Sequence, residues 1–203
     1  MLKKRYTKGN QIDSLNILIT KIISYAMPGT LFVISAPSGA GKTSLVLALL
    51  KHRPGLSRLI TYTTRSPRAG EVNGCDYHFI TESDFKLKIE QNFFLEWSCA
   101  YGAYYGSPRS LLDDIRQGQS FIAIVDRLGA RALHKLITSA VCIWIVPPSL
   151  SVLERRLTLR ASDCQERIRY RLQLARQEME QERIEPFFQF VIVNDSFEEA
   201  LHA

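Results

Sequence analysis

A short glycine-rich stretch constrains the fold of this chain more than any other feature. An apolar run at residues 31–34 leads into Ala36-Pro-Ser-Gly-Ala-Gly-Lys-Thr43, and an amphipathic segment follows from Ser44. This order of strand, small-residue loop and helix is typical of a phosphate-binding loop, here with alanine at its first position. Glycine-rich turns before helices are common, but a Gly-Lys-Thr sequence between an apolar strand and an apolar helix is much rarer. The stretch therefore predicts binding of a nucleoside triphosphate.

The residue types of this loop match the chemistry of a polyphosphate. Small residues let backbone N–H groups turn towards phosphate oxygens, and the N-terminus of the following helix adds partial positive charge. Lys42 can reach the outer phosphates, and the Thr43 hydroxyl can ligate Mg²⁺, so Thr43 is the predicted metal ligand. The predicted nucleotide-binding residues of the loop are Ser38, Gly39, Ala40, Gly41, Lys42, Thr43 and Ser44.

The rest of the chain predicts an α/β fold, a P-loop NTPase-type parallel sheet flanked by helices. Unbroken apolar runs at 121–125, 141–146 and 190–193 are typical of buried parallel strands. Helices are expected over 42–52, 107–118, about 129–137 and 165–183, with Ser107-Pro108 as a hydroxyl cap and first-turn proline. A further helix is expected to end at Leu159, with either Ser149 or Ser151 as its cap. The stretch 59–106 breaks the alternation with short strands at 59–63, 77–80 and 93–97, a helix ending near 92 and a turn at 101–106. It reads as an inserted subdomain.

Residues 1–28 form an N-terminal extension that is either helical or disordered. Polar residues interrupt its apolar part and no cleavage site follows, so a short amphipathic helix is favoured over a signal peptide. Met27 lies just before the first core strand, so it is a second candidate for the true start of the chain.

Charge and cysteine usage exclude several classes of function. The net charge of +6 suits a protein that handles several phosphates, but the basic residues are dispersed, so nucleic-acid binding is not expected. The four cysteines show no metal-ligand spacing, which favours reduced cysteines and a cytoplasmic location. No apolar run approaches the ~20 residues of a membrane span.

A second group of polar residues lies in the inserted segment. Two arginines and two tyrosines, Arg65, Arg68, Tyr77 and Tyr105, are suited to clamping a phosphate dianion. Glu96 lies in the apolar run 93–97, where a carboxylate is costly unless it meets donors. Guanine offers N1–H and N2–H₂ side by side, whereas adenine has an acceptor at N1, so such a carboxylate selects guanine.

Three stretches together resemble the guanylate kinase family. They are Ser35–Thr43, Thr63-Thr-Arg-Ser-Pro-Arg-Ala-Gly-Glu71 and Tyr104-Tyr-Gly-Ser107, and Val191-Ile-Val-Asn-Asp195 is similar to the family near its end. The resemblance covers about residues 29–200. It implies a kinase that transfers the γ-phosphate of ATP to GMP, and by extension to dGMP, with Mg²⁺, to give ADP and GDP.

The resemblance also implies domains and residue roles. A core (29–60, 107–155 and 172–203) would carry a GMP-binding subdomain (61–106) and a lid (156–171). Arg65, Arg68, Tyr77 and Tyr105 would hold the GMP phosphate, and Thr61, Glu96, Ser107 and Asp126 would read the guanine. Catalysis would rest on Lys42 and the lid arginines Arg156, Arg160 and Arg171, and Asn194 would lie beside the adenine. The protein is expected to be a monomer or a homodimer.

The chain departs from the family pattern at several positions. Ile124 stands where the family has an acid, Arg127-Leu-Gly129 replaces Trp-Gln-Gly, and Leu159 and Ala161 replace glycines that flank a lid arginine. Two alternatives to a GMP kinase stay open. One is a catalytically weakened guanylate-kinase-like module that acts in binding. The other is a related P-loop kinase for a different small molecule, such as a phosphorylated sugar.

Overall fold

The computed structural model describes residues 29–37, 39–100, 102–159 and 164–195. The expected N-terminal helix therefore lies outside the described residues, as do Ser38 and Arg160. The chain divides into two compact units. Of the described residues, the first unit contains 34–53 and 142–195, and the second contains 29–33 and 54–141. Each unit is described by itself below.

In the described part of the first unit, parallel strands are combined with three helices. β1 (Leu31–Ser35) contributes its last two residues and is followed by α2 (Lys42–Lys51). β8 (Val141–Val146) pairs in parallel with β9 (Phe190–Val193), and the strand order is β1-β8-β9. Both strands match the predicted ranges, because each is an apolar run long enough to fill one strand.

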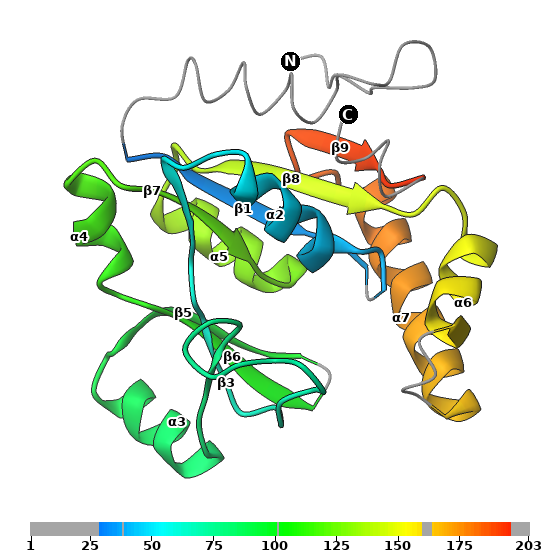
Figure 1. The fold of residues 1–203 in the computed structure, drawn as a ribbon, viewed down its shortest axis with the longest axis horizontal. Coiled ribbons are helices and arrows are strands. Elements are labelled where there is room, and N and C mark those ends of the chain that lie inside the picture. Colours follow the sequence, from blue (N-terminus) through cyan, green and yellow to red (C-terminus); the bar gives the residue numbers. More distant parts are fainter. Residues whose placement is uncertain (1–28, 38, 101, 160–163, 196–203) are drawn as a thin grey trace. The chain divides into compact units, whose positions relative to one another are not determined.

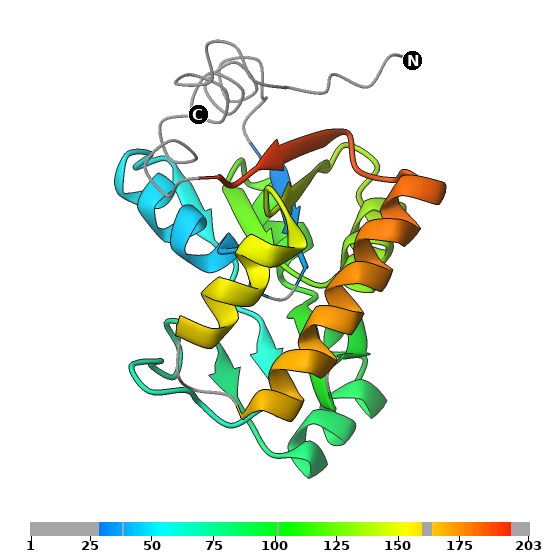
Figure 2. The same ribbon diagram turned by 90° about the vertical axis from the view of Figure 1, so that its right-hand side faces the viewer.

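Helices α6 (Leu150–Leu159) and α7 (Gln165–Ile184) lie side by side in this unit (Figure 2). Their contact is an apolar seam of Leu153 and Leu157 on α6 with Ile168 and Ala175 on α7. The remaining faces of α7 are mostly exposed and charged, which accounts for the highly polar sequence of this long helix.

The second unit contains strands of two sheets (Figure 1). β2 (Leu56–Arg58) pairs in parallel with β7 (Ser120–Ile124), in the strand order β2-β7-β1. Helices α4 (Leu111–Arg116) and α5 (Arg127–Leu136) belong to this part of the unit. The buried face of α5 presents Gly129, Ala130 and Leu133.

The other sheet is four-stranded and mixed, in the order β4-β3-β6-β5. It consists of β3 (Tyr62–Thr63), β4 (His78–Phe79), β5 (Phe94–Ala100) and β6 (Ala103–Pro108). Helix α3 (Glu82–Glu90) buries Phe85, whose ring stacks on Phe94 and Tyr104. The Thr81 hydroxyl caps α3 by accepting a hydrogen bond from the Asp84 N–H.

Two predictions of secondary structure are wrong in this sheet. The predicted turn at 101–106 is instead largely strand, because β6 begins at Ala103 and pairs antiparallel with β5. Ser107 and Pro108 do not begin a helix; they end β6, and α4 begins at Leu111. The pairing of Ser107 with Glu96 across the sheet outweighs the local helix-start signal of a hydroxyl and a proline.

Only part of the predicted strand 59–63 is a strand in the structure. Its residues Tyr62 and Thr63 form β3, whereas the preceding strand, β2, covers Leu56–Arg58. The Leu59 N–H still donates to the Ile122 carbonyl, so the chain leaves the first sheet only after that residue. Among the described residues, no helix combines the length and apolar character that a membrane span requires.

Candidate functional site

The phosphate loop of the first unit has the backbone conformation that its glycines predict. Gly39 and Gly41 have φ of 93° and 90°, in the left-handed region that favours glycine. Gly41 is the N-cap residue of α2. The Ala40 N–H donates to the Pro37 carbonyl at 3.1 Å, which closes a turn. The loop is therefore a tight turn that opens directly into a helix N-terminus.

Neighbouring side chains leave no room for a larger residue at Gly39 or Gly41. A Cβ at Gly39 would lie 2.7 Å from Leu157 Cδ2, and one at Gly41 would lie 2.6 Å from Asn194 Nδ2. The Asn194 amide donates to the Ala40 carbonyl at 2.7 Å, and its side chain is buried. The loop thus rests on α6 at one glycine and on the residue after β9 at the other.

The first turn of α2 supplies the polar groups of the loop. Lys42 Nζ lies 3.4 Å from the Ala36 carbonyl, at the loop's own entry. Thr43 is half-buried and Ser44 is exposed. No acidic residue stands in this turn, so the positive end of the helix dipole is not neutralised from within the helix.

The structure describes two of the three predicted lid arginines. Arg156 on α6 is half-buried, and its Nη2 donates to the Asp195 carbonyl at 2.7 Å. Arg171 on α7 is half-buried as well. Arg156 is thus tied to the chain just after Asn194, the residue that holds the phosphate loop.

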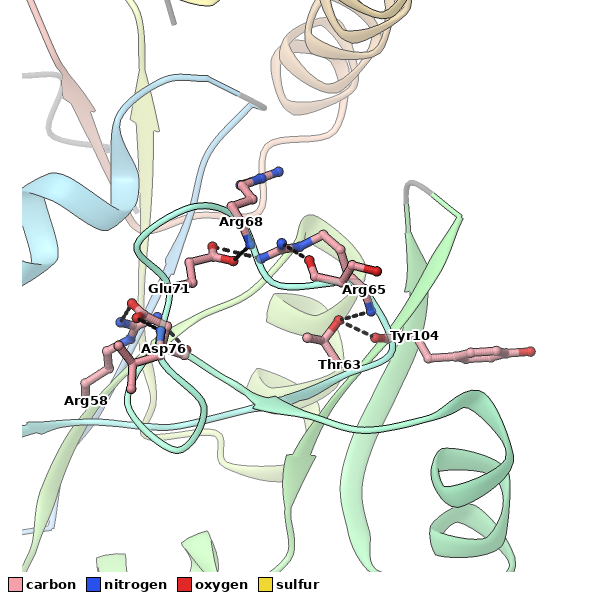
Figure 3. Close-up of polar contacts among 9 residues, drawn as sticks. Arg58, Thr63, Arg65, Arg68, Glu71, Asp76 and Tyr104 are labelled. Atoms are coloured by element: carbon pink, nitrogen blue, oxygen red, sulfur yellow. Dashed lines mark hydrogen bonds and ion pairs between the residues drawn. The ribbon is translucent and has the colours of Figure 1, made fainter. Parts of the chain in front are cut away.

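The second unit brings together a cluster of charged residues (Figure 3). Arg65 donates to Glu71 Oε1 at 2.9 Å, and the other oxygen of Glu71 accepts from the Arg68 N–H at 2.7 Å. Burial lowers the pKa of Arg65, but its ion pair with Glu71 outweighs this and raises the pKa above the ordinary value. Glu71 therefore orders the loop that carries both predicted phosphate-binding arginines. The Arg68 side chain is exposed and points away from the pair (Figure 3).

The two predicted tyrosines lie beside Arg65. Its guanidinium lies 5.4 Å from the centre of the Tyr77 ring, and the Tyr77 and Tyr105 rings are 6.2 Å apart. Arg58 approaches the Tyr77 ring at 5.8 Å and forms an ion pair with Asp76 at 3.2 Å. Burial raises the pKa of Tyr77, so its hydroxyl stays protonated and is a hydrogen-bond donor.

The antiparallel pairing of β5 and β6 aligns the predicted guanine-reading residues. A register shift between Phe94 and Glu96 places Glu96 opposite Ser107, and the Ser107 hydroxyl donates to Glu96 Oε1 at 2.6 Å. Glu96 is 7% exposed. Burial raises the pKa of Glu96 to about 7, and the nearby charge of Asp126 adds to this effect, although the Ser107 hydrogen bond opposes it.

Asp126, the N-cap residue of α5, lies near Glu96 and belongs to the same set of predicted guanine-reading residues. Its Oδ1 accepts from the Gly129 N–H at 2.7 Å, which caps the helix, and its Oδ2 accepts from the Ser98 hydroxyl at 2.6 Å. A Cβ at Gly129 would lie 3.2 Å from Glu96 Oε2, so the helix start approaches the carboxylate closely. Two carboxylates and two hydroxyls thus gather over β5.

Thr61 completes the predicted guanine-reading set, and Ile124 is the position that departs from the family pattern. Thr61 is buried, and its carbonyl accepts from the His78 N–H. Ile124 ends β7 and is 6% exposed, so the position where the family has an acid is an apolar one here.

Four polar residues of these clusters were not found by sequence reasoning. Glu71 lies at the end of the Thr63–Glu71 motif, and Ser98 stands two residues after Glu96, hence on the same face of a strand. Arg58 and Asp76 carry no sequence signal, since their contact joins β2 to the loop before β4.

The family model for guanylate kinase matches residues 28–203. The chain belongs to the guanylate kinase family. The guanylate kinase of Shewanella sp. (strain MR-7) is 45% identical over 175 residues, which cover 85% of this chain and 83% of that protein. The guanylate kinase of Myxococcus xanthus is 45% identical over 174 residues, covering 85% and 82%. The crystal structure of guanylate kinase from Anaplasma phagocytophilum aligns with a TM-score of 0.71 at 29% identity, over 86% of this chain and 81% of that one.

Membership of the guanylate kinase family confirms three predictions: the family itself, the P-loop NTPase-type parallel sheet with flanking helices, and an ATP-dependent phosphotransferase as the class of enzyme. The roles of individual residues and the boundaries of core, subdomain and lid stay predictions.

Proposed function

We propose that this protein transfers the γ-phosphate of ATP to GMP, giving ADP and GDP, and that it accepts dGMP as well. The observation that carries the choice of acceptor is the buried Glu96, held by Ser107 and approached by Asp126 in the unit that also contains Arg65 and Tyr77. An apolar setting with two carboxylates favours a ligand edge rich in N–H donors.

Guanine matches this acceptor set, and adenine does not. An ionised Glu96 can accept from N1–H and from one N2–H, and Thr61, Ser107 and Asp126 complete the proposed base-reading set. Adenine would place its N1 lone pair against the carboxylate and leave the buried charge unpaired, which is a strong penalty.

The charged loop fits the phosphate of the acceptor. A guanidinium can bind a phosphate through two parallel hydrogen bonds, and a protonated phenol adds a donor. We assign this role to Arg65, Arg68, Tyr77 and Tyr105. Glu71 holds the Arg65 guanidinium and the backbone at Arg68, which reduces the loss of side-chain and loop freedom when a phosphate binds.

The phosphate loop fits the donor nucleotide. Its positive-φ glycines and the helix N-terminus that carries no acid suit the phosphates of ATP. Thr43 is the proposed protein ligand of Mg²⁺, which when bound would neutralise phosphate charge. Among the described residues, no three His, Cys, Asp or Glu side chains gather as a metal site, so the ion would depend on Thr43 and on phosphate oxygens.

Catalysis would rest on alignment and neutralisation of charge rather than covalent chemistry by the protein. The GMP phosphate oxygen forms the new bond to the γ-phosphorus as the bond to the β-phosphate oxygen of ATP breaks. Lys42, Arg156, Arg160 and Arg171 are the proposed cations for the negative charge of the transferred group. One N–H of the Asn194 amide supports the phosphate loop through the Ala40 carbonyl, and a position beside the adenine stays the proposed role of this residue in nucleotide binding.

A coupled assay of ADP release tests the proposal. With ATP and Mg²⁺, turnover is expected with GMP and dGMP and not with AMP, UMP or CMP. Turnover of none of the five, together with measurable binding of GMP, would favour the weakened binding module, which the apolar Ile124 supports. Light scattering during size-exclusion chromatography tests the predicted monomer or homodimer.

A further inference from the structure

Ser98 links two features of the acceptor site, the strand β5 that carries Glu96 and the carboxylate that begins α5. It lies on β5 two residues after Glu96, so both side chains project from the same face of the strand. Its hydroxyl donates to Asp126 Oδ2 at 2.6 Å, across a separation of 28 residues. A strand of one sheet is therefore tied to the carboxylate that begins α5.

This contact settles the orientation of the Asp126 carboxylate. The terminal torsion of an aspartate is broad, so a single hydrogen bond leaves its plane loosely defined. Here Oδ1 is occupied by the Gly129 N–H and Oδ2 by the Ser98 hydroxyl. A carboxylate oxygen has two lone-pair positions, so Oδ2 can still accept from a ligand.

The hydroxyl also counteracts repulsion between two acids. The charges of Glu96 and Asp126 interact, because the charge of Asp126 contributes to the raised pKa of Glu96. Without a donor on Oδ2, that repulsion would favour rotation of Asp126 away from Glu96. Each of the two carboxylates is therefore held by one serine hydroxyl: Glu96 by Ser107 and Asp126 by Ser98.

We propose that Ser98 is a specificity-determining positioning residue, which holds Asp126 so that it accepts the guanine N2–H that Glu96 leaves unused. Guanine has three N–H donors on this edge, one on N1 and two on N2. Glu96 takes N1–H and one N2–H, and the second N2–H is the donor for Asp126. This inference rests on the proposed function, because it assumes that guanine occupies the site.

IMP separates this role from a merely structural one, because it keeps N1–H and lacks the 2-amino group. Ser98→Ala is expected to raise the Kd and KM for GMP by about 5- to 20-fold, with kcat changed less than about twofold, since orientation rather than the contact itself is lost. The Kd and KM of Ser98→Ala for IMP should differ from those of wild type by less than about twofold. Ser98→Thr keeps the hydroxyl and should restore most of the discrimination between GMP and IMP.

Two further variants serve as controls. Cys99→Ala alters the next residue of β5, which is exposed and projects from the opposite face, and should leave both ligands unaffected. In an Asp126→Asn background the effect of Ser98→Ala should shrink to below about twofold, because the residue through which Ser98 acts has changed.

Calorimetric Kd values and steady-state kinetics of all variants decide the inference. Equal losses for GMP and IMP in Ser98→Ala, or no loss for either, would overturn it while leaving the proposed kinase activity intact. Wild-type protein that binds GMP without turnover would instead remove the proposed function, and the Kd values would still test Ser98. Wild-type protein that binds no GMP would overturn both.

Discussion

Glu96 is expected to destabilise the ligand-free fold, and Glu96→Gln tests this directly. The ordinary pKa of a glutamate is 4.5, and burial raises that of Glu96 to about 7. The difference of about 2.5 corresponds to about 3 kcal/mol at ~1.4 kcal/mol for each pKa unit. A glutamine can still accept from the Ser107 hydroxyl but carries no charge to bury or to repel Asp126.

The sign of the pH dependence follows from linkage. Because the folded state holds the Glu96 proton more tightly than the unfolded state, the stabilising contribution of the protonated group is complete below about pH 4.5 and lost as the pH rises through about 7. We therefore compare the free energy of unfolding of Glu96→Gln with that of wild type at two pH values. The excess of the variant over wild type should be about 2–3 kcal/mol larger at pH 8 than at pH 5.

Urea denaturation at several pH values between 5 and 8 measures this difference. Glu90→Gln, which alters an exposed glutamate of α3, is the matched control and should show no such trend. A difference between Glu96→Gln and wild type that does not vary with pH would refute the reasoning. The same reasoning predicts that GMP binding releases a proton from Glu96, so the KM for GMP should rise below about pH 7.

Three further substitutions address other parts of the molecule. Glu71→Ala should raise the KM for GMP about tenfold, and leave that for ATP unchanged, because Arg65 loses a charge-assisted hydrogen bond; an unchanged KM for GMP in steady-state kinetics would contradict this role. Gly41→Ala should weaken ATP binding at least about tenfold, because φ is 90° and a neighbouring amide lies 2.6 Å from the new Cβ. Gly55→Ala, with nothing within 4 Å, is its control in a titration with ATP. Ile124→Asp should raise kcat and make it depend more strongly on Mg²⁺. An unchanged kcat in the coupled assay would show that the missing acid at this position does not limit turnover.

Sequence reasoning succeeded where local pattern and burial agree. β8 and β9 have the predicted bounds because each is a buried apolar run, and α7 differs from its prediction by one residue. It failed at Ser107-Pro108, where a local helix-start signal competes with strand pairing across the sheet. Local residues cannot show that pairing, because the partner, Glu96, lies 11 residues earlier.

The residues of the candidate site also fall into those that local sequence patterns predict and those that they do not. Residues with a distinctive spacing, such as those of the phosphate loop, were found from their own order in the chain. Arg58 and Asp76 were missed because their ion pair depends on how the loop before β4 folds back, which no short pattern encodes. Ser98 was missed because its partner Asp126 is brought to it only by the packing of α5 against β5.

The bond from Asn194 to the Ala40 carbonyl joins positions 154 residues apart. During synthesis the phosphate loop emerges early, but the amide that supports it emerges only after β9 has been made. A nascent chain, or a fragment that ends before β9, would therefore carry the complete loop sequence without its support. Because that contact can form only after Asn194 has been synthesised, affinity for ATP should be among the last properties that the growing chain acquires.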